Sequence, residues 1–261
     1  ARFWTKALAD DGLLPFREPF AKLLNQGQLL GPDGNRMSKT RGNVIDPWSV
    51  IQKYGADAFR WHLYTATAPH QERRFTPAQV GEVERNFTNT LWNVLGFFST
   101  YANLDGWDPG AGARFLPVLR KAHFTPLDRW LLSRLHALVR DVTAAYEAYD
   151  VNGATRPIQA FVEDLSNWYV RRSRRRYWSA DDPQDKQAAY AALYETLVTL
   201  SKLLAPAMPF LAEELYQRLV RAVDSTTAES VHLSEWPLWE AGVIEEEVNR
   251  QMALVMKLAS L

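Results

Sequence analysis

The sequence predicts a mainly α-helical protein in which a mixed first part is followed by an antiparallel helical bundle. After residue 110, apolar residues recur at spacings of three and four over several stretches, which is the pattern of helices with one buried face. The connections between these stretches are short, and short connections favour antiparallel neighbours. Before residue 110 the pattern differs, because a strand-like run and a polar loop precede the first long helices.

The first part contains helices, one strand and a turn-rich end. A helix around Arg2–Ala9 leads to a strand, Leu23–Leu30, and then to the polar loop. Helical segments are predicted at Pro47–Ala66 and Pro77–Tyr101. The stretch Asp105–Gly112 contains two aspartates and three glycines, so we expect a linker there.

The second part is predicted from stripes of apolar residues. Its first stripe runs through Leu131, Leu135, Leu138, Val142 and Ala145, which lie on one face of a helix. Further helices are expected at Phe161–Tyr169, Leu193–Leu204, Met208–Val223 and Ile244–Leu261, with a short extended segment at Ser230–Trp236.

Composition limits the classes of protein that fit. The 261 residues allow one or two domains, and ten tryptophans, ten tyrosines and twelve phenylalanines supply a bulky core. The absence of cysteine excludes disulfides and cysteine-ligated zinc. No apolar run approaches the roughly 18 residues of a membrane span and no signal peptide opens the chain, so we expect a cytoplasmic protein without a membrane partner. The net charge is zero, so nucleic-acid binding would depend on a local patch.

A polar, glycine-bracketed segment at residues 34–43 is the most informative stretch, and we expect it to be a mobile surface loop. It places Lys39 and two arginines beside the hydroxyls of Ser38 and Thr40. The point charge of the lysine, the forked N–H donors of the arginines and the neutral hydroxyl donors together suit binding of a polyphosphate. By composition alone the segment also fits a basic, solvated hairpin tip.

The order of the residues in this loop adds a family resemblance. Arg36 to Thr40, followed by Arg-Gly-Asn-Val-Ile-Asp-Pro, closely resembles the KMSKS loop of class I aminoacyl-tRNA synthetases. The resemblance implies that Lys39 stabilises the pyrophosphate leaving group during amino-acid activation. It assigns Arg36, Met37, Ser38, Lys39 and Thr40 to ATP binding, with Mg²⁺ accompanying ATP in the intact enzyme. Arg36 replaces the family's usual lysine and Thr40 its usual serine, which keeps the charge and the hydroxyl.

The resemblance covers nearly the whole chain. The sequence of Tyr54–Arg60 is similar to the one that follows the loop in isoleucyl, valyl and leucyl enzymes. Two later stretches, Leu127–Leu135 and Asp164–Trp178, are most similar to isoleucyl enzymes. The opening residues are closer to leucyl enzymes. We therefore expect isoleucine as the amino acid and its tRNA as the partner, with leucine and then valine as alternatives. The first part would be the end of a Rossmann-like nucleotide-binding domain, and the bundle an anticodon-binding domain.

The second nucleotide motif of class I enzymes, HIGH, is missing from the sequence. None of the five histidines is followed by a residue, a glycine and a histidine, and no glycine-rich phosphate loop follows a strand. We therefore expect the C-terminal part of a longer enzyme, which alone would not activate an amino acid. No metal site is expected in this span.

Five arginines lie within six residues of one predicted helix. At 100° per residue, Arg171, Arg174 and Arg175 share one side, and Arg172 and Arg176 share another. One interpretation is an ion-paired helix end; the acidic residues available nearby are Glu163, Asp164, Asp181, Asp182 and Asp185. The other is contact with RNA, and the aromatic residues available to stack on bases are Trp168, Tyr169, Tyr177 and Trp178. The family resemblance favours tRNA binding.

Several other residues are weaker candidates for functional roles. Gly27 lies on the strand that borders the adenosine pocket in the family, although a glycine beside a strand bulge explains it as well. Asp57 suits the start of a helix, and the Glu213–Glu214 pair suits a first helical turn. His123 and His232 are isolated, and lone histidines are usually packed or surface residues.

The sequence thus predicts four parts. Residues 1–66 end the catalytic domain, 67–110 form a connecting helical segment, 111–240 form the anticodon-binding bundle, and 241–261 begin a C-terminal extension. Two other functions stay open. The chain could be a stand-alone tRNA-binding module, or a helical interaction protein whose arginines are only structural.

Overall fold

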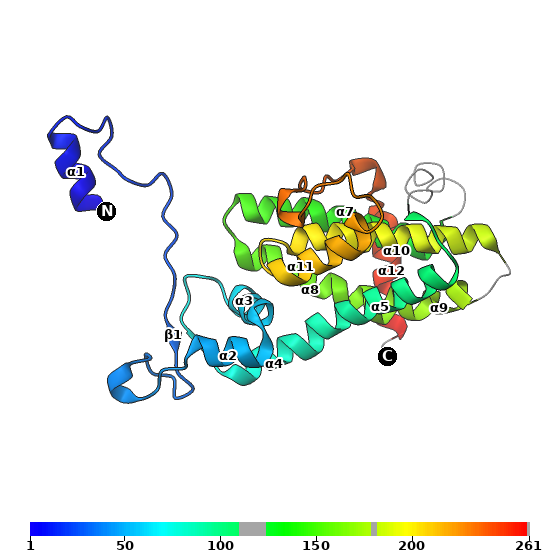
Figure 1. Ribbon diagram of the computed structural model, residues 1–261, viewed down its shortest axis with the longest axis horizontal. Coiled ribbons are helices and arrows are strands. Elements are labelled where there is room, and N and C mark those ends of the chain that lie inside the picture. Colours follow the sequence, from blue (N-terminus) through cyan, green and yellow to red (C-terminus); the bar gives the residue numbers. More distant parts are fainter. Residues whose placement is uncertain (110–123, 179–181, 260–261) are drawn as a thin grey trace.

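Helices make up most of the computed structural model, which describes residues 1–109, 124–178 and 182–259. In this part of the chain the sheet is a single pair of short parallel strands, β1 (Leu29–Leu30) and β2 (Arg73–Arg74). Figure 1 shows the pair at the end of the molecule opposite α9. The mainly α-helical class predicted from the sequence is confirmed.

The helices of the first part follow the prediction. Gly55 has a φ of 83°, a conformation that glycine adopts readily, and it separates two helices within the segment that starts at Pro47. The segment from Pro77 continues through a π-helical turn without a break. The bounds are α1 Arg2–Asp10, α2 Pro47–Tyr54, α3 Ala56–Thr65, α4 Pro77–Val83, the π-helical turn Glu84–Thr88 and α5 Asn89–Leu104.

The strand predicted at Leu23–Leu30 is wrong over most of its length. Only Leu29 and Leu30 form a strand, because they pair with Arg73 and Arg74; Leu30 also forms an isolated antiparallel bridge with Arg36. Leu23 is 60% exposed and belongs to the extended segment that links α1 to β1 (Figure 1). An apolar run without a paired backbone does not form a strand.

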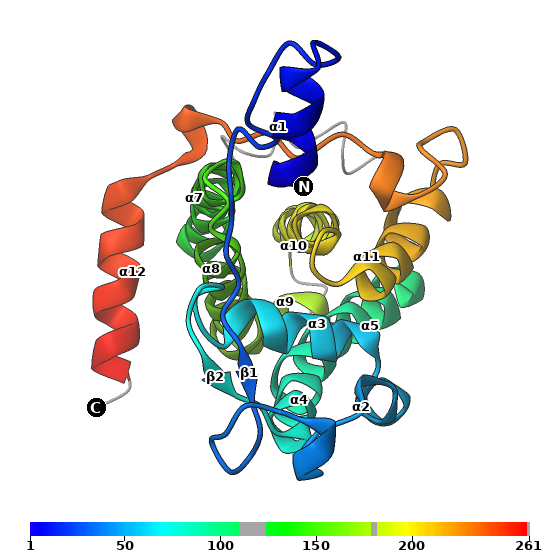
Figure 2. The same ribbon diagram turned by 90° about the vertical axis from the view of Figure 1, so that its left-hand side faces the viewer.

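The second part is the predicted antiparallel bundle, built around α10. Figure 2 shows α10 end-on, with α7, α8, α5 and α11 around it. Most residues of α10 from Ala188 onwards are buried, as expected of a central helix. The bounds are α7 Pro126–Glu147, α8 Val151–Asp164, the π-helical turn Leu165–Val170, α9 Arg171–Trp178, α10 Pro183–Leu204, α11 Pro209–Tyr216, the π-helical turn Gln217–Arg221 and α12 Glu246–Ala259.

Local capping explains where the bundle helices begin. Thr125 and Asp128 form a capping box before α7, and Pro126 occupies the first turn. Asp182 accepts hydrogen bonds from the backbone N–H groups of Gln184 and Asp185 at the start of α10.

Two local predictions in the second part are wrong. The segment Ser230–Trp236 is not extended, because Ser230 caps a 3-10 helical turn, Val231–Leu233. Glu213 lies beyond the first turn of α11, and its carboxylate accepts from Ser230 Oγ and Val231 N instead. This carboxylate therefore fixes the following loop and does not stabilise a helix start.

The predicted linker is packed in the part that the structure describes. Trp107 is buried, and its Nε1 donates to Gln187 at 2.7 Å. The carboxylate of Asp105 accepts from the Tyr190 hydroxyl and pairs with Lys186. Residues 110–112, the boundary predicted at 110/111, His123 and Asp181 lie outside the described residues, and the other predicted boundaries stay predictions.

Candidate functional sites: the Lys39 loop and the arginine helix

The Lys39 loop, residues 34–43, is fastened at its base and open at its tip. Asn43 Oδ1 accepts from Ser38 N at 2.8 Å, and Asn43 Nδ2 donates to Arg36 O. Met37 packs on a small apolar cluster formed by Val50, Ala58, Phe75 and Val80. These contacts fix the backbone on both sides of the tip.

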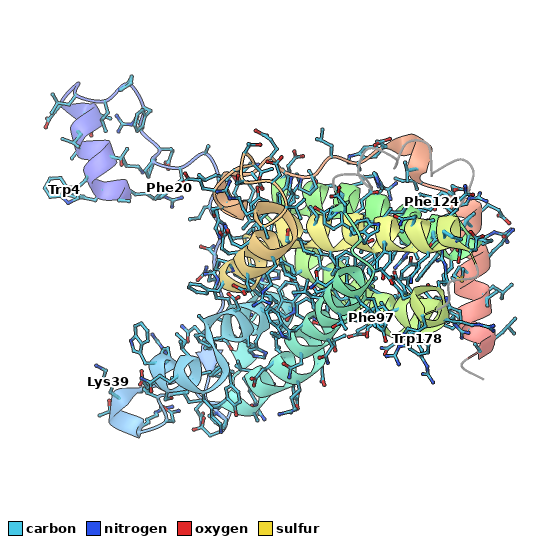
Figure 3. The ribbon with its side chains drawn as sticks, turned by 45° about the vertical axis from the view of Figure 1, so that its right-hand side comes forward. Trp4, Phe20, Lys39, Phe97, Phe124 and Trp178 are labelled. Atoms are coloured by element: carbon cyan, nitrogen blue, oxygen red, sulfur yellow. The ribbon has the colours of Figure 1, made fainter. Side chains whose placement is uncertain are left out.

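The cations of the loop are free to meet a ligand. Arg36, Lys39 and Arg41 are exposed, and within the described chain none of them is paired with a carboxylate. Figure 3 shows Lys39 pointing outward at one extremity of the molecule. The hydroxyls of Ser38 and Thr40 lie 3.1 Å apart beside it. The arrangement presents positive charge and hydroxyl donors to solvent, as binding of a polyphosphate requires.

Gly27 has a structural explanation that needs no nucleotide. Its N–H donates to Pro69 O at 2.7 Å, and a Cβ at this position would lie 2.1 Å from Gln71 O. The backbone that approaches Gly27 closely is therefore that of the segment leading into β2. Its predicted contact with ATP stays a prediction.

The arginine helix, residues 165–178, contains one arginine whose side chain is largely buried and paired inside the protein. Arg176 donates to both carboxylate oxygens of Asp128 at 2.7 and 2.8 Å, and also to Asp185. Its side chain is 13% exposed and that of Asp128 is fully buried. Burial lowers the pKa of Arg176, but the hydrogen bonds to Asp128 and Asp185 outweigh it and raise the pKa overall. The prediction that Arg176 contacts tRNA therefore needs correction, because its donors are used inside the protein.

The other arginines lie outside. Arg171, Arg172, Arg174 and Arg175 are all exposed, although the helical spacing groups Arg172 with Arg176. The guanidinium of Arg172 stacks over Trp168, 3.5 Å from the ring centroid. Among the described residues these four make no ion pair.

The aromatic side chains of the arginine helix also divide into exposed and buried ones. Trp178 is 59% exposed, whereas Trp168 is partly covered by α12, where its Nε1 donates to Met252 Sδ. Tyr169 and Tyr177 are buried, so their predicted stacking on bases is wrong. Burial raises the pKa of Tyr169, and its hydroxyl donates to Asp128 at 2.7 Å.

Two carboxylates have roles that the sequence did not reveal. Asp128 anchors Arg176 across 48 residues, although its capping box with Thr125 is visible in the sequence. Asp57 starts α3 as predicted, but it also accepts from the backbone N–H groups of Phe210 and Leu211 at the start of α11. Burial raises the pKa of Asp57, opposed by these two hydrogen bonds.

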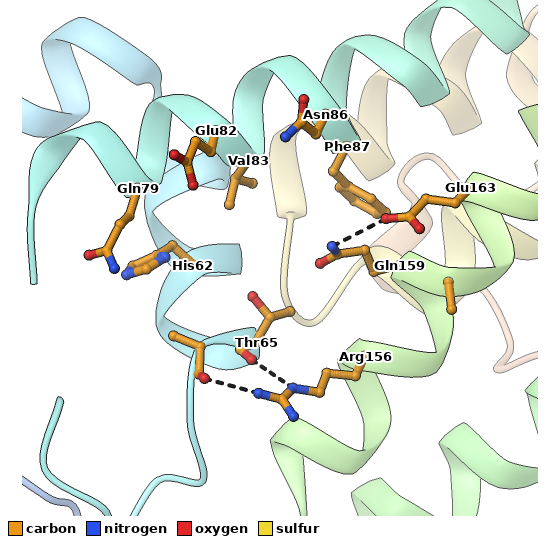
Figure 4. Close-up of a pocket in the computed structure, with 12 residues that line it drawn as sticks. His62, Thr65, Gln79, Glu82, Val83, Asn86, Phe87, Arg156, Gln159 and Glu163 are labelled. Carbon is orange, nitrogen blue, oxygen red and sulfur yellow. Dashed lines mark hydrogen bonds between the residues drawn. The ribbon is translucent and has the colours of Figure 1, made fainter. Parts of the chain in front are cut away.

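A cavity of about 540 Å³ lies between α3, α4 and α8 (Figure 4). Most of the residues that line it are polar: His62, Thr65, Gln79, Glu82, Asn86, Arg156, Gln159 and Glu163. The Nε2 atom of His62 is buried without a hydrogen-bond partner in the described chain, and burial lowers the pKa of this imidazole. None of the residues predicted to bind ATP or tRNA lines the cavity.

Two further histidines of the described chain are packed or exposed singly. His136 is packed between Glu195 and the backbone N–H of Glu240, and His232 is exposed. Among the residues that the structure describes, no group of three histidine, cysteine or acidic side chains is placed to hold a metal ion. Over the same residues, no helix has the length and apolar character needed to cross a bilayer.

Comparison with known proteins finds two family models and many relatives. The model described as "Anticodon-binding domain of tRNA ligase" matches residues 128–261, and the model described as "tRNA synthetases class I (I, L, M and V)" matches residues 1–75. An isoleucine–tRNA ligase of Dehalococcoides mccartyi is 47% identical over 261 residues, which is 100% of this chain and 25% of the relative. One of Thermus thermophilus is 45% identical over 262 residues, again 100% of this chain and 24% of the relative.

A solved structure supports the same class. The LeuRS of Agrobacterium radiobacter K84, in a ternary complex with tRNA and LeuAMS, superposes with a TM-score of 0.68 at 26% identity. The match covers 94% of this chain and 27% of that chain. Fold, loop and bundle thus define a class I tRNA synthetase architecture.

The chain belongs to the class I tRNA synthetases of the I, L, M and V group and carries that family's anticodon-binding domain. It spans about a quarter of the length of the isoleucine–tRNA ligases that it matches.

Proposed function

We propose that the chain forms part of an isoleucine–tRNA ligase, supplying the loop that faces the ATP phosphates and the domain that binds the anticodon. The observation that carries the proposal is the 47% identity to an isoleucine–tRNA ligase along the whole chain, with the Lys39 loop included. The complete enzyme would join isoleucine to ATP as an adenylate, releasing pyrophosphate, and then esterify the end of isoleucine tRNA.

In the first reaction, the carboxylate of isoleucine attacks the α-phosphorus of ATP and pyrophosphate leaves with the bridging oxygen. Lys39 stabilises the negative charge that develops on the leaving group. Arg36, Ser38 and Thr40 bind the phosphates as the loop closes, and Met37 fastens the loop to the small apolar cluster. Mg²⁺ arrives with ATP as part of the substrate, and Gly27 borders the adenosine.

In the second reaction, the arginine helix binds tRNA. Arg171, Arg174 and Arg175 contact phosphates and Trp178 stacks on a base, since all four are exposed. Arg172 and Trp168 form the adjoining part of this surface, and Arg176 supports it from beneath through Asp128. The enzyme would act in the cytoplasm, with residues 1–66 in the catalytic domain and 111–240 in the bundle.

The proposal is tested by isotope exchange between pyrophosphate and ATP in the complete ligase. We expect isoleucine to support exchange better than leucine or valine. Replacing Lys39 by alanine should lower the exchange rate by about 10²-fold with little change in the KM for isoleucine, since the interaction that is removed forms with the leaving group.

Lys53→Ala is the matched control, because Lys53 is an exposed lysine on α2 outside the loop. Equal losses of rate and of isoleucine binding in Lys39→Ala would contradict the leaving-group role. Preference for leucine or valine would contradict the assignment of isoleucine.

A further inference from the structure

Helix α3 lies between the two apolar clusters of the molecule. Ala58 belongs to the small cluster on which Met37 of the Lys39 loop packs. Trp61, one turn later, belongs to the main cluster of the bundle, and its ring stacks on Phe87 with centroids 4.4 Å apart. A continuous path of packed side chains therefore runs from the loop through α3 into the bundle.

The N-terminal end of α3 is joined to the corner between α10 and α11. Asp57 accepts from Leu211 N at 2.6 Å and from Phe210 N at 3.4 Å, so it caps a helix that begins 152 residues later in the sequence. One turn on, Arg60 donates from Nε to Ala207 O at 3.0 Å and from Nη2 to Pro206 O at 2.8 Å. Asp57 thus satisfies free N–H groups at the start of α11, and Arg60 satisfies carbonyls of the turn between α10 and α11.

The C-terminal end of α3 is joined to α8. Asn152 Nδ2 donates to Tyr64 O and Thr65 O at 3.1 and 3.0 Å. Arg156 donates to Thr65 O and Ala66 O at 2.9 and 3.0 Å, as Figure 4 shows. The last carbonyls of α3, which a helix usually leaves to solvent or to a local cap, are therefore bound by a helix of the bundle.

Helix α3 thus caps α11 through Asp57, and side chains of α8 cap the C-terminal end of α3. Between these ends, Ala58 packs in the small cluster and Trp61 packs in the main cluster. Every one of these contacts links the side of the molecule that carries the Lys39 loop to the side that carries the arginine helix. A rotation of one side against the other would break these hydrogen bonds to backbone groups, five of which are partly buried, and would leave the backbone groups without partners, which is costly.

We propose that α3 fixes the Lys39 loop in one orientation relative to the tRNA-binding bundle, with Asp57, Arg60 and Arg156 as positioning residues for the tRNA-dependent step. This inference rests on the proposed function. Adenylate formation needs the loop and the rest of the catalytic domain, but it does not need the bundle. Transfer to tRNA needs both sides in register, because a displacement of about 1 Å can lower a rate about 10²-fold.

The test compares two carboxylates that both accept backbone N–H groups. Asp57→Ala breaks a contact between the two sides, whereas Glu213→Ala breaks a contact to Val231 N within the bundle. For each variant of the complete ligase, we would measure pyrophosphate exchange, affinity for isoleucine tRNA, and kcat/KM for aminoacylation of that tRNA.

We expect Asp57→Ala to lower kcat/KM for aminoacylation by about tenfold or more, while exchange and tRNA affinity stay within about twofold. Glu213→Ala should leave all three within about twofold. Asp57→Asn, which keeps an acceptor for Leu211 N, should recover most of the loss.

Two results would overturn the inference. One is an unchanged rate of aminoacylation in Asp57→Ala. The other is a joint fall of exchange, tRNA affinity and aminoacylation, which would indicate a general folding defect. Absence of exchange in the unsubstituted ligase would overturn the proposed function, and this inference with it.

Discussion

Arg175 and Arg176 are neighbours in the sequence with opposite surroundings. The guanidinium of Arg176 is enclosed by Asp128 and Asp185, whereas Arg175 lies exposed on the outer side of the same helix. A buried ion pair adds little over an apolar pair, but the loss of one partner leaves the other carboxylate buried and unpaired. The two residues should therefore respond to the same substitution in different assays.

We predict that Arg176→Ala lowers the free energy of unfolding of this chain by about 3–5 kcal/mol, because Asp128 would stay buried without its cation. Arg175→Ala should change it by less than about 0.5 kcal/mol, as exposed substitutions usually do, and should weaken tRNA binding. Denaturant unfolding of both variants checks the first effect, and filter binding checks the second. Equal destabilisation by the two substitutions would contradict the assignment of Arg176 to the interior.

The surroundings of the individual arginines could be predicted only in part from the sequence. Helical spacing places Arg171, Arg174 and Arg175 together, and all three are exposed, but it groups Arg172 with Arg176 although Arg172 is exposed as well. The partner of Arg176 was not predictable, because Asp128 lies 48 residues away in the sequence. Long-range ion pairs depend on tertiary packing and leave no periodic signal in one sequence.

At the scale of elements, the short sheet depends on one close approach. β1 and β2 pair over two residues, and Gly27 just before β1 meets the Gln71 backbone with no room for a side chain. Helix α5 offers a contrast, because Gly96 has nothing within 4 Å of where its Cβ would lie.

We predict that Gly27→Ala destabilises the chain by about 1–3 kcal/mol, as overpacking usually does, because the added methyl group would displace the backbone at Gln71. Gly96→Ala should instead stabilise it by about 0.5–1 kcal/mol, since alanine suits an exposed helical position better than glycine. Thermal or denaturant unfolding of the two variants gives the comparison. A neutral Gly27→Ala would show that the contact with residues 69–72 is not formed.

Helices were predictable and the remaining elements were not, for a physical reason. A helix makes its hydrogen bonds within one segment, so apolar periodicity can indicate it, although the stripe Leu193–Leu204 predicted only the second half of α10, which begins at Pro183 after the cap Asp182. A strand needs a partner, and the run from Leu23 finds one only at Leu29 and Leu30. The turn at Val231–Leu233 depends on Ser230 and on Glu213 from another element.

At the scale of the whole molecule, positive charge is local although the chain is neutral overall. Figure 3 shows Lys39 and Trp178 at opposite ends of the molecule. A tRNA engaged with the arginine helix while its end is served at the Lys39 side would therefore extend along most of the protein. Helix α3 and its caps lie between these ends, which is why their geometry matters to the proposed second reaction.

The tRNA-binding role of the arginine helix is tested by filter binding of this chain to isoleucine, leucine and valine tRNA at two salt concentrations. We predict salt-sensitive binding that favours isoleucine tRNA. Replacing Arg171, Arg174 and Arg175 together by alanine should weaken it and reduce the slope of log K against log salt by about one for each phosphate that is no longer neutralised. A control triple variant should have little effect, because its arginines lie outside the arginine helix and α12 and are paired with carboxylates: Arg17, Arg140 and Arg218.

The two outcomes are clearly separated. Loss of binding in the first triple variant, with binding retained in the control, would support the arginine helix as the tRNA-binding surface. Absence of binding at either salt concentration, or equal losses in the two triple variants, would contradict it.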